Sequence, residues 1–254
     1  MENIENNLKV AIEGTARAEA ALSKSGSDAG KIDLDTGRDI KIAGDRLAEK
    51  AVIDCLKEGS DFDVLSEESG YLALGKQKID DPYWIVDPLD GSYNFSRGMP
   101  LFACSIALWH ESGPVLGVIR DLSNGDVYSA AVGKGAWLNG EGMCVSDVNE
   151  REKAVIATGF PVKMDISHES LNQFFRFLIR FKKVRMLGAA AIMLAYVAAG
   201  KIDIYREENT RIWDVAAGLA LVKAAGGKVE FTETKNKTTL SVTAWNGLFE
   251  PEMT

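Results

Sequence analysis

The sequence has few of the residues on which several common kinds of protein depend. Its three cysteines, Cys55, Cys104 and Cys144, are odd in number and widely spaced, which excludes a disulfide framework and the ligand spacing of a zinc finger. Histidine occurs only twice, and neither His110 nor His168 adjoins an acidic cluster in the sequence. We therefore expect both histidines to be surface or packing residues rather than ligands.

Long apolar runs are also missing. The longest one, 189–199, is well short of the ~20 residues that a membrane-spanning helix needs. The first residues are acidic and are not followed by an apolar stretch, so we expect no signal peptide. Together with the cysteine pattern, this favours a cytoplasmic protein with no membrane partner.

Basic residues are the minority among the charged ones. The chain has 29 Lys and Arg against 37 Asp and Glu, which gives a net charge of −8. This balance argues against nucleic acid as a partner, although a bound cation could still present a small anionic substrate with positive charge. The remaining composition is that of a globular protein, with 46% hydrophobic residues in 254, and the length fits one large domain or two packed halves.

The periodicity of the apolar residues predicts helices around a long antiparallel β region. Two turn signals, Gly113-Pro114 and Asn124-Gly125, divide the β region, and the second is typical of a hairpin. Residues 23–39 are rich in Gly, Ser and Asp and predict a polar loop. The fold class is therefore α+β in layers. The expected helices span about 1–20, 44–57, 169–181, 189–199 and 214–225, and the expected strands span 62–65, 83–86, 103–109, 115–119, 127–131, 155–158, 184–186 and 202–205.

The most informative segment is 84–92, Trp-Ile-Val-Asp-Pro-Leu-Asp-Gly-Ser. An apolar strand leads directly into Asp87 and Asp90, and Pro88 between them predicts that the chain leaves the strand there. Gly91 allows a tight turn and a close approach to a ligand. Two carboxylates 4 Å apart repel each other by ~4 kcal/mol at an effective dielectric constant near 20, so either one is protonated or a cation lies between them. Oxygen ligands on such a turn suit Mg²⁺, whereas a solvated surface turn is the simpler alternative.

Two further acidic segments favour the interpretation of 84–92 as part of a metal site. Glu67 and Glu68 follow a short β run, and Asp214 begins an otherwise apolar helix. Taken alone, the glutamates could be a solvated pair and Asp214 could be a helix cap.

Taken together and in order, these segments resemble the inositol monophosphatase superfamily. These are Mg²⁺-dependent, lithium-sensitive sugar phosphatases, and fructose-1,6-bisphosphatases are among them. Ser92 stands where many members have threonine and keeps the hydroxyl, whereas Ala189 replaces a Ser or Thr and removes one polar substrate contact. The matching segments are Glu67-Glu68-Ser69, Trp84 to Ser92, Arg185 to Ala191 and Trp213 to Gly218.

The resemblance covers the whole chain and implies an architecture. It implies a layered αβαβα sandwich in which 1–254 form a single unit. Residues 1–150 would be an N-terminal α+β half with the metal site, and 151–254 a C-terminal α/β half with substrate-binding segments. A homodimer is implied as well.

The resemblance also implies a set of metal ligands. Glu67, Asp87 and the backbone carbonyl of Leu89 would hold one Mg²⁺. Asp87, Asp90 and Asp214 would hold a second, and Glu67 would contribute to a weaker third. Two such ions lower the pKa of a bound water and stabilise both the attacking and the leaving oxygen of a phosphoryl transfer.

Catalysis would then use water as the nucleophile, without a covalent phosphoenzyme. Ser92 and Glu67 would orient the water, and Asp45 would support the Ser92 hydroxyl. The backbone N–H groups of Gly91 and Ser92, at the start of a short helix, would hold phosphate oxygens.

Other matched positions would contact the substrate. Glu207 would bind its hydroxyl groups, although a solvated acidic loop explains Glu207 equally well. Residues 23–39 are a candidate lid or an ordinary surface loop, and Met186 and Met193 are expected in the core. The predicted substrate-binding residues are Asp90, Gly91, Ser92, Arg185, Gly188, Ala189, Ala190, Glu207 and Asp214.

The expected function is hydrolysis of a sugar or polyol phosphate, with inositol 1-phosphate and fructose 1,6-bisphosphate as candidates. A second phosphate would favour the bisphosphate, if Lys201 or an arginine such as Arg185, Arg206 or Arg211 bound it. A 3′-phosphoadenosine 5′-phosphate nucleotidase and a histidinol phosphatase are alternatives within the family. A non-catalytic protein that binds metal or phosphate is a further alternative.

Overall fold

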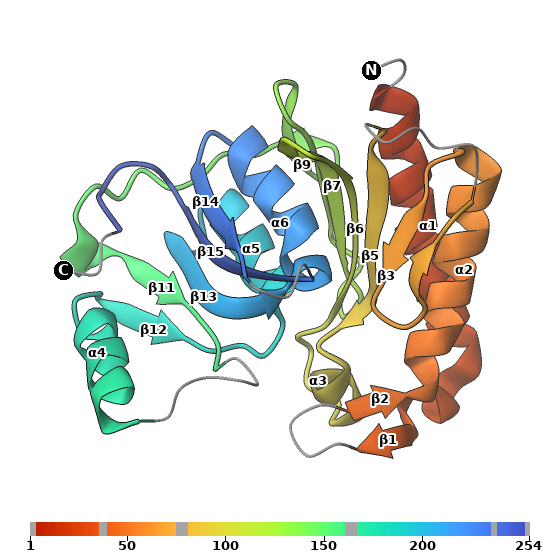
Figure 1. The fold of residues 1–254 in the computed structure, drawn as a ribbon, viewed down its shortest axis with the longest axis horizontal. Coiled ribbons are helices and arrows are strands. Elements are labelled where there is room, and N and C mark those ends of the chain that lie inside the picture. Colours follow the sequence, from red (N-terminus) through yellow and green to blue (C-terminus); the bar gives the residue numbers. More distant parts are fainter. Residues whose placement is uncertain (1–3, 36–39, 75–80, 161–166, 235–237, 252–254) are drawn as a thin grey trace.

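The computed structural model describes residues 4–35, 40–74, 81–160, 167–234 and 238–251. Its helices and sheets form five layers (Figure 1). One helical layer lies between the two sheets, and one more covers the outer face of each sheet. None of the helices in these ranges has the length and apolar character needed to cross a membrane. The helices are α1 (Ile4–Ser25), α2 (Ala43–Gly59), α3 (Ser92–Ser96), α4 (His168–Leu178), α5 (Ala190–Ala198) and α6 (Ile212–Ala224), with short 3-10 helices at Gly26–Gly30 and Arg151–Lys153.

The larger sheet has eight strands in the order β10-β9-β8-β7-β6-β5-β3-β4. All of its neighbouring pairs are antiparallel except β3 and β5, which are parallel. Its strands are β3 (Val64–Ser66), β4 (Gly70–Leu72), β5 (Tyr83–Asp90), β6 (Ala103–His110), β7 (Gly113–Asp121), β8 (Val127–Ala131), β9 (Gly135–Leu138) and β10 (Glu141–Gly142).

The smaller sheet has five strands in the order β12-β11-β13-β15-β14. Strand β11 pairs in parallel with both β12 and β13, and the remaining pairs are antiparallel. Its strands are β11 (Val155–Ala157), β12 (Lys183–Arg185), β13 (Ile204–Arg211), β14 (Lys228–Glu233) and β15 (Thr239–Trp245).

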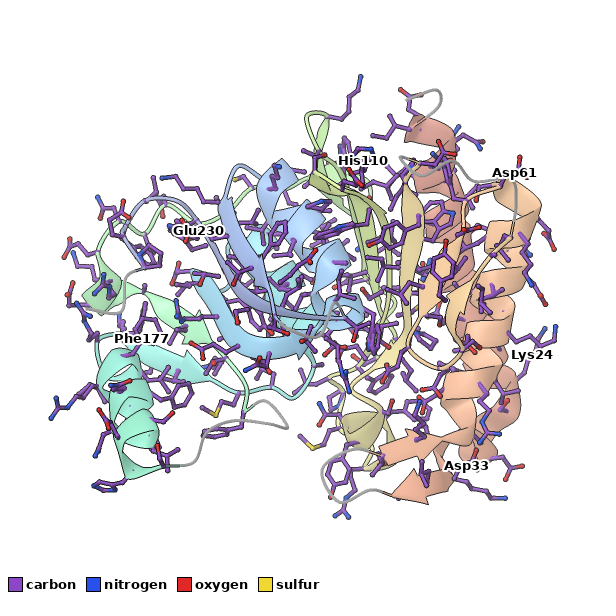
Figure 2. All side chains as sticks on the ribbon, in the orientation of Figure 1. Lys24, Asp33, Asp61, His110, Phe177 and Glu230 are labelled. Atoms are coloured by element: carbon purple, nitrogen blue, oxygen red, sulfur yellow. The ribbon has the colours of Figure 1, made fainter. Side chains whose placement is uncertain are left out.

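Three hydrophobic clusters fill the space between adjacent layers. The largest lies between the two sheets and contains the apolar side chains of α5 and α6, which are apolar on all faces because both helices are enclosed. A second cluster joins α1 and α2 to the outer face of the larger sheet. A third joins α4, through Phe177 (labelled in Figure 2), to Ile204 and Trp245 of the smaller sheet. The α+β class and the αβαβα layering are thus confirmed.

Glycines allow the central helices to approach their neighbours closely. A Cβ at Gly117 of β7 would lie 2.4 Å from the carbonyl oxygen of Ala217 in α6, so a side chain there would push helix and sheet apart. Likewise, a Cβ at Gly218 would lie 2.3 Å from the Cβ of Leu194 in α5. The position of α6, which begins beside the functional site, therefore depends on these contacts.

Two local predictions are wrong. The segment 23–39 is not a loop in its described part: α1 continues to Ser25, the 3-10 helix follows, and β1 (Ile32–Asp35) pairs with β2 (Ile40–Ile42). Alternating Ile and Leu in β1 was the missed signal, and residues 36–39 lie outside the described residues. The chain also does not leave the sheet at Pro88, because β5 continues to Asp90. The other predicted helices and strands match elements of the structure, including the antiparallel β7–β8 hairpin around Asn124-Gly125. Strands β4, β9, β10, β14 and β15 were not predicted.

Candidate functional site

A cavity of about 440 Å³ lies where β5 and α3 meet the first turns of α5 and α6. Residues of both halves of the chain line it, from Ile40 to Asp214. Every residue predicted for the site lines this cavity except Arg185. Segments that are far apart in the sequence therefore meet at one place.

Three carboxylates converge in the cavity, each from a different element. Glu67 directly follows β3, Asp87 lies in β5, and Asp214 lies in the first turn of α6. One oxygen of each lies within 4.8 Å of the others. Three oxygen donors at this spacing form a set of the kind that a hard cation such as Mg²⁺ binds.

The electrostatics of this cluster favour a bound cation. Burial, followed by repulsion from neighbouring carboxylates, raises the pKa of Asp87 and of Asp214 well above the ordinary value. The same causes raise the pKa of Glu67 to about 8. Either protons or a divalent cation must offset this concentration of negative charge.

An irregularity in β5 brings both aspartates of the Asp-Pro-x-Asp segment to the cavity. In a regular strand, residues three positions apart point to opposite faces. The register between β5 and β6 shifts between Asp87 and Asp90, and Pro88, which has no N–H to donate to a neighbouring strand, lies at this shift. The carboxylate of Asp87 also accepts a hydrogen bond from the N–H of Leu89 at 3.0 Å.

Asp90 is bound to the start of α5. Its Oδ2 accepts a hydrogen bond from the N–H of Ala191 at 2.7 Å, and the N–H of Ala190 also donates to this carboxylate. Burial, the largest cause, raises the pKa of Asp90 to about 7 despite these bonds. Of the predicted aspartate ligands, Asp90 lies outside the three-oxygen cluster, yet its charge repels that of Asp214.

Ser92 and Asp45 form a second polar pair in the cavity. The Ser92 hydroxyl lies 2.8 Å from Oδ1 of Asp45 and 2.8 Å from the carbonyl oxygen of Leu89, so its single proton serves one of two acceptors. Oδ2 of Asp45 accepts from the N–H of Ile42 at 2.7 Å. Burial raises the pKa of Asp45 to about 6. Gly91, between Asp90 and Ser92, has a φ of 86°, which favours glycine.

Residues 188–190 line the cavity beside this pair, and a Cβ at Gly91 would lie 3.2 Å from the Cβ of Ala189. Asn94, which is buried in α3, donates to the carbonyl oxygens of Leu101 at 2.8 Å and Leu187 at 2.9 Å. Because Leu187 precedes Gly188, this bond fixes the predicted substrate-binding segment against the Asp-Pro-x-Asp turn.

Glu207 is a half-buried residue of β13 that lines the cavity, rather than part of a solvated loop. The Tyr205 hydroxyl donates to its Oε2 at 2.8 Å, and burial raises the pKa of Glu207. A Cβ at Gly159 would lie 2.7 Å from the same oxygen, so a side chain there would displace the Glu207 carboxylate. Thr210 and Phe160 also line the cavity and were not predicted. A glycine directly after a short strand is the only signal in the sequence that points to this part of the wall.

Two predictions about the 185–193 region need correction. The Arg185 side chain is exposed, donates to the carbonyl of Val184 at 3.0 Å and does not line the cavity, because β12 directs it to solvent at the edge of the sheet. Met186 is 43% exposed and lines the cavity instead of filling the core. Met193 is buried, as expected, and contributes to the same wall.

The histidines lie elsewhere, as expected. His110 is the last residue of β6, an interior strand, and lies at the end of the larger sheet opposite to α3 (Figures 1 and 2), and His168 begins α4. The β1–β2 hairpin, by contrast, borders the cavity through Ile40, and Lys41 forms an ion pair of 2.7 Å with Glu68. Whether residues 23–39 close over the site stays a proposal.

Comparisons with known proteins agree with this geometry. The family model described as inositol monophosphatase family matches residues 3–250. The Nus factor SuhB of Xylella fastidiosa is 37% identical over 187 residues, which is 73% of this chain and 66% of that protein. The extragenic suppressor protein suhB from Bartonella henselae superposes with a TM-score of 0.84 at 34% identity, covering 95% of this chain and 94% of that one.

An inositol monophosphatase from Anabaena (Nostoc) sp. PCC 7120 superposes with a TM-score of 0.82 at 31% identity, covering 97% of this chain and 92% of the other. The match to the family model extends over nearly the whole sequence. The chain therefore belongs to the inositol monophosphatase family.

Proposed function

We propose that this protein is a Mg²⁺-dependent phosphomonoesterase that hydrolyses a sugar or polyol phosphate with water as the nucleophile. The observation that carries the proposal is the convergence of Glu67, Asp87 and Asp214 beside the Ser92–Asp45 pair. Membership of the family, and the likeness to the Anabaena inositol monophosphatase, support it.

The donor set of the cavity fits Mg²⁺. Glu67, Asp87 and Asp214, together with Asp90 and the carbonyl of Leu89, offer only oxygen atoms, and their mutual repulsion is relieved by divalent charge. We propose two ions, with Glu67 contributing to a third. Bound there, Mg²⁺ supplies a water of lowered pKa and charge stabilisation of the transferring phosphoryl group.

Groups of the protein itself orient the attacking water and bind the phosphate. Ser92 and Glu67 orient the attacking water, and Asp45 holds the Ser92 hydroxyl in place. The N–H groups of Gly91 and Ser92 hold phosphate oxygens. The water oxygen forms a new bond to phosphorus while the ester P–O bond breaks, and the alcohol leaves with the proton that water gives up. Inorganic phosphate and a free polyol are the products.

The walls of the cavity favour a polyol monophosphate. Glu207, held by Tyr205, offers carboxylate oxygens to substrate hydroxyl groups, and the 188–190 backbone faces the same space. Among the described lining residues there is no arginine or lysine, so none of them is suited to a second phosphate. Inositol 1-phosphate is therefore preferred to fructose 1,6-bisphosphate as the proposed substrate, and 3′-phosphoadenosine 5′-phosphate, which also carries two phosphates, is a weaker alternative.

Release of inorganic phosphate from these three esters tests the proposal. We expect turnover of inositol 1-phosphate that requires Mg²⁺, stops in EDTA and is abolished by Asp90→Asn in a protein that remains folded. Hydrolysis that continues in excess EDTA would reject the proposal.

A non-catalytic role is the second candidate. The name Nus factor SuhB, carried by the relative from Xylella fastidiosa, does not denote a phosphatase, and this observation favours the candidate. Calorimetry that shows binding of inositol 1-phosphate with Mg²⁺ but no phosphate release would support it. The intact Ser92–Asp45 contact is the feature that makes us prefer catalysis.

We also propose a cellular location, an oligomeric state and a class of partners for this protein. Its free cysteines fit the reducing cytoplasm. Family membership favours a homodimer, which sedimentation would test. The acidic net charge of −8 is our reason for proposing no nucleic-acid partner, and the relatives named Nus factor SuhB make binding of RNA the control experiment for that proposal.

A further inference from the structure

A buried carboxylate in α2 binds the two ends of the loop that carries Glu67. Glu49 is only 7% exposed, and it accepts hydrogen bonds from the hydroxyl of Ser66, from the hydroxyl of Ser69 at 2.6 Å and from the N–H of Ser69 at 2.9 Å. Ser66 is the last residue of β3, and Ser69 precedes β4. Glu49 therefore fixes the loop on both sides of Glu67.

The same loop has attachments of other kinds. The N–H of Glu67 donates to the carbonyl oxygen of Val86 in β5 at 3.1 Å, next to Asp87. On the outer side, Glu68 forms its ion pair with Lys41. Glu49 is the attachment that reaches the loop from α2, and it does so with three donors around one carboxylate.

Helix α2 also carries Asp45, one turn before Glu49. Residues four positions apart lie on the same face of a helix, and both of these side chains are buried. Through Asp45 the helix contacts Ser92, and through Glu49 it contacts the Glu67 loop. One rigid element thus sets the distance between the hydroxyl and the carboxylate that we propose to orient the attacking water.

The loop needs such an attachment because its carboxylate is repelled. The negative charge of Asp214 repels that of Glu67, so the carboxylate keeps its place in the cluster against this repulsion. We propose that Glu49 is a positioning residue that holds Glu67 at its place in the cation site through Ser66 and Ser69. This inference rests on the proposed function, because it gives Glu67 the role of a metal ligand.

Binding of Mn²⁺, followed by electron paramagnetic resonance in the whole chain, tests this inference. Mn²⁺ prefers the same oxygen ligands as Mg²⁺ and is directly detectable. Glu49→Gln keeps the size of the side chain but replaces one acceptor oxygen with an NH₂ donor that faces other donors. We expect its Mn²⁺ affinity to fall about tenfold or more, which is the usual effect of losing a group that orients a metal ligand.

Two further variants separate positioning from general stability. Ser69→Ala removes one of the three hydrogen bonds at an exposed residue, so the protein should fold, with an affinity reduced about threefold. Asp203→Asn is the matched control: Asp203 is 5% exposed, accepts from Ser146 and from the N–H of Val155, and does not line the cavity. It should lower the melting temperature and leave the Mn²⁺ affinity unchanged.

The outcomes distinguish this inference from the proposed function. Unchanged Mn²⁺ affinity in both Glu49→Gln and Ser69→Ala would overturn the positioning role. If Glu49→Gln fails to fold, unchanged affinity in Ser69→Ala alone overturns it. Should the unsubstituted protein bind Mn²⁺ but release no phosphate, the proposed function fails while the comparison of affinities still decides the role of Glu49. Absence of Mn²⁺ binding in the unsubstituted protein would reject both.

Discussion

At the scale of single residues, the site is defined by carboxylates whose ionisation conflicts with their burial. Asp87 and Asp90 are almost wholly enclosed, and both have raised pKa values. A fold pays a cost in stability for keeping such groups together, so their retention makes sense when a cation or a proton is bound between them. Substitutions at these residues should therefore separate stability from activity.

Asp214→Asn is expected to stabilise the protein in EDTA at pH 8. The substitution removes one of the three charges whose oxygens lie within 4.8 Å of each other. At that distance a pair of charges repels by ~3 kcal/mol at an effective dielectric constant near 20, and partial protonation reduces the gain to about 1 kcal/mol. The melting temperature in EDTA should rise by roughly 2–4 °C.

The same variant should lose the stabilisation that Mg²⁺ gives to the unsubstituted protein. Differential scanning calorimetry with EDTA and with Mg²⁺ measures both effects. A lower melting temperature in EDTA would contradict our description of the cluster.

Ser92→Ala should lower kcat by about 10²-fold or more, because the hydroxyl that we propose to orient the water is lost. Ser92→Thr is the control, since it keeps the hydroxyl, and its kcat should stay within a few-fold of the unsubstituted enzyme. Steady-state phosphate release measures both variants. Equal activity of the alanine and threonine variants would exclude a role for the hydroxyl.

At the scale of the elements, close packing places the start of α6, and with it Asp214, against the larger sheet. Gly117→Ala would put a methyl group 2.4 Å from a backbone oxygen of α6. We expect the free energy of unfolding to fall by about 1–3 kcal/mol, with a loss of activity as α6 moves away.

The control for this prediction is Gly142→Ala. Gly142 has no atom within 4 Å of the added Cβ, so the free energy of unfolding should change by no more than about 0.5 kcal/mol. Urea denaturation of the two variants provides the comparison. Equal stability of both would show that the approach of α6 to β7 is not tight.

The elements also show which parts of the structure could be predicted from the sequence. Continuous apolar runs identified α5 and α6, most of whose residues are buried, and Asn124-Gly125 identified the β7–β8 hairpin. The β1–β2 hairpin was missed because its strands have 4 and 3 residues, too short for alternation to stand out from the surrounding polar residues. The bulge at Pro88 was missed because a proline in a run that otherwise predicts a central strand argues against the strand continuing there.

The site residues that belong to sequence motifs could be predicted. The Asp-Pro-x-Asp-Gly-Ser segment, Glu67 and Asp214 were identified from their residue types and from the family resemblance. Glu49 and Gly159 act through contacts with residues that are distant in sequence, and Tyr205 acts through a hydrogen bond to Glu207 two positions along β13. Nothing in their local pattern indicates those contacts. Arg185 was wrongly placed because a motif match gives position along the chain but not the direction of a side chain.

At the scale of the whole molecule, the two sheets and the α5–α6 layer between them fix the separation of the acidic groups before any ligand binds. Strand β5 belongs to the larger sheet, while α5 and α6 pack between the sheets (Figure 1). The protein is therefore expected to fold without metal, with a free energy of unfolding that depends on pH.

The metal-free protein should become less stable as pH rises from about 4.5 to about 8. Folding raises the pKa of Glu67 from 4.5 to about 8 and that of Asp90 from 3.8 to about 7. The folded state then binds more protons than the unfolded state in this range, and the stabilisation from these groups is lost as pH passes their folded pKa values. Chemical denaturation in EDTA across this range measures the effect.

With Mg²⁺ present, the dependence should weaken or reverse, because the ion binds the deprotonated carboxylates. Glu67→Gln provides the control, since it removes one of the titrating groups and should flatten the metal-free profile. A metal-free protein whose stability rises steadily to pH 8 would contradict the raised pKa values.

The central claim is that Glu67, Asp87 and Asp214 form one cation site. Anomalous scattering from a crystal grown with Mn²⁺ tests it most directly, because the metal is located independently of any activity. We predict an anomalous peak within coordination distance of an oxygen from each of these three residues. A fully ordered cavity with no peak, or a peak that only one of the three carboxylates contacts, would contradict the account.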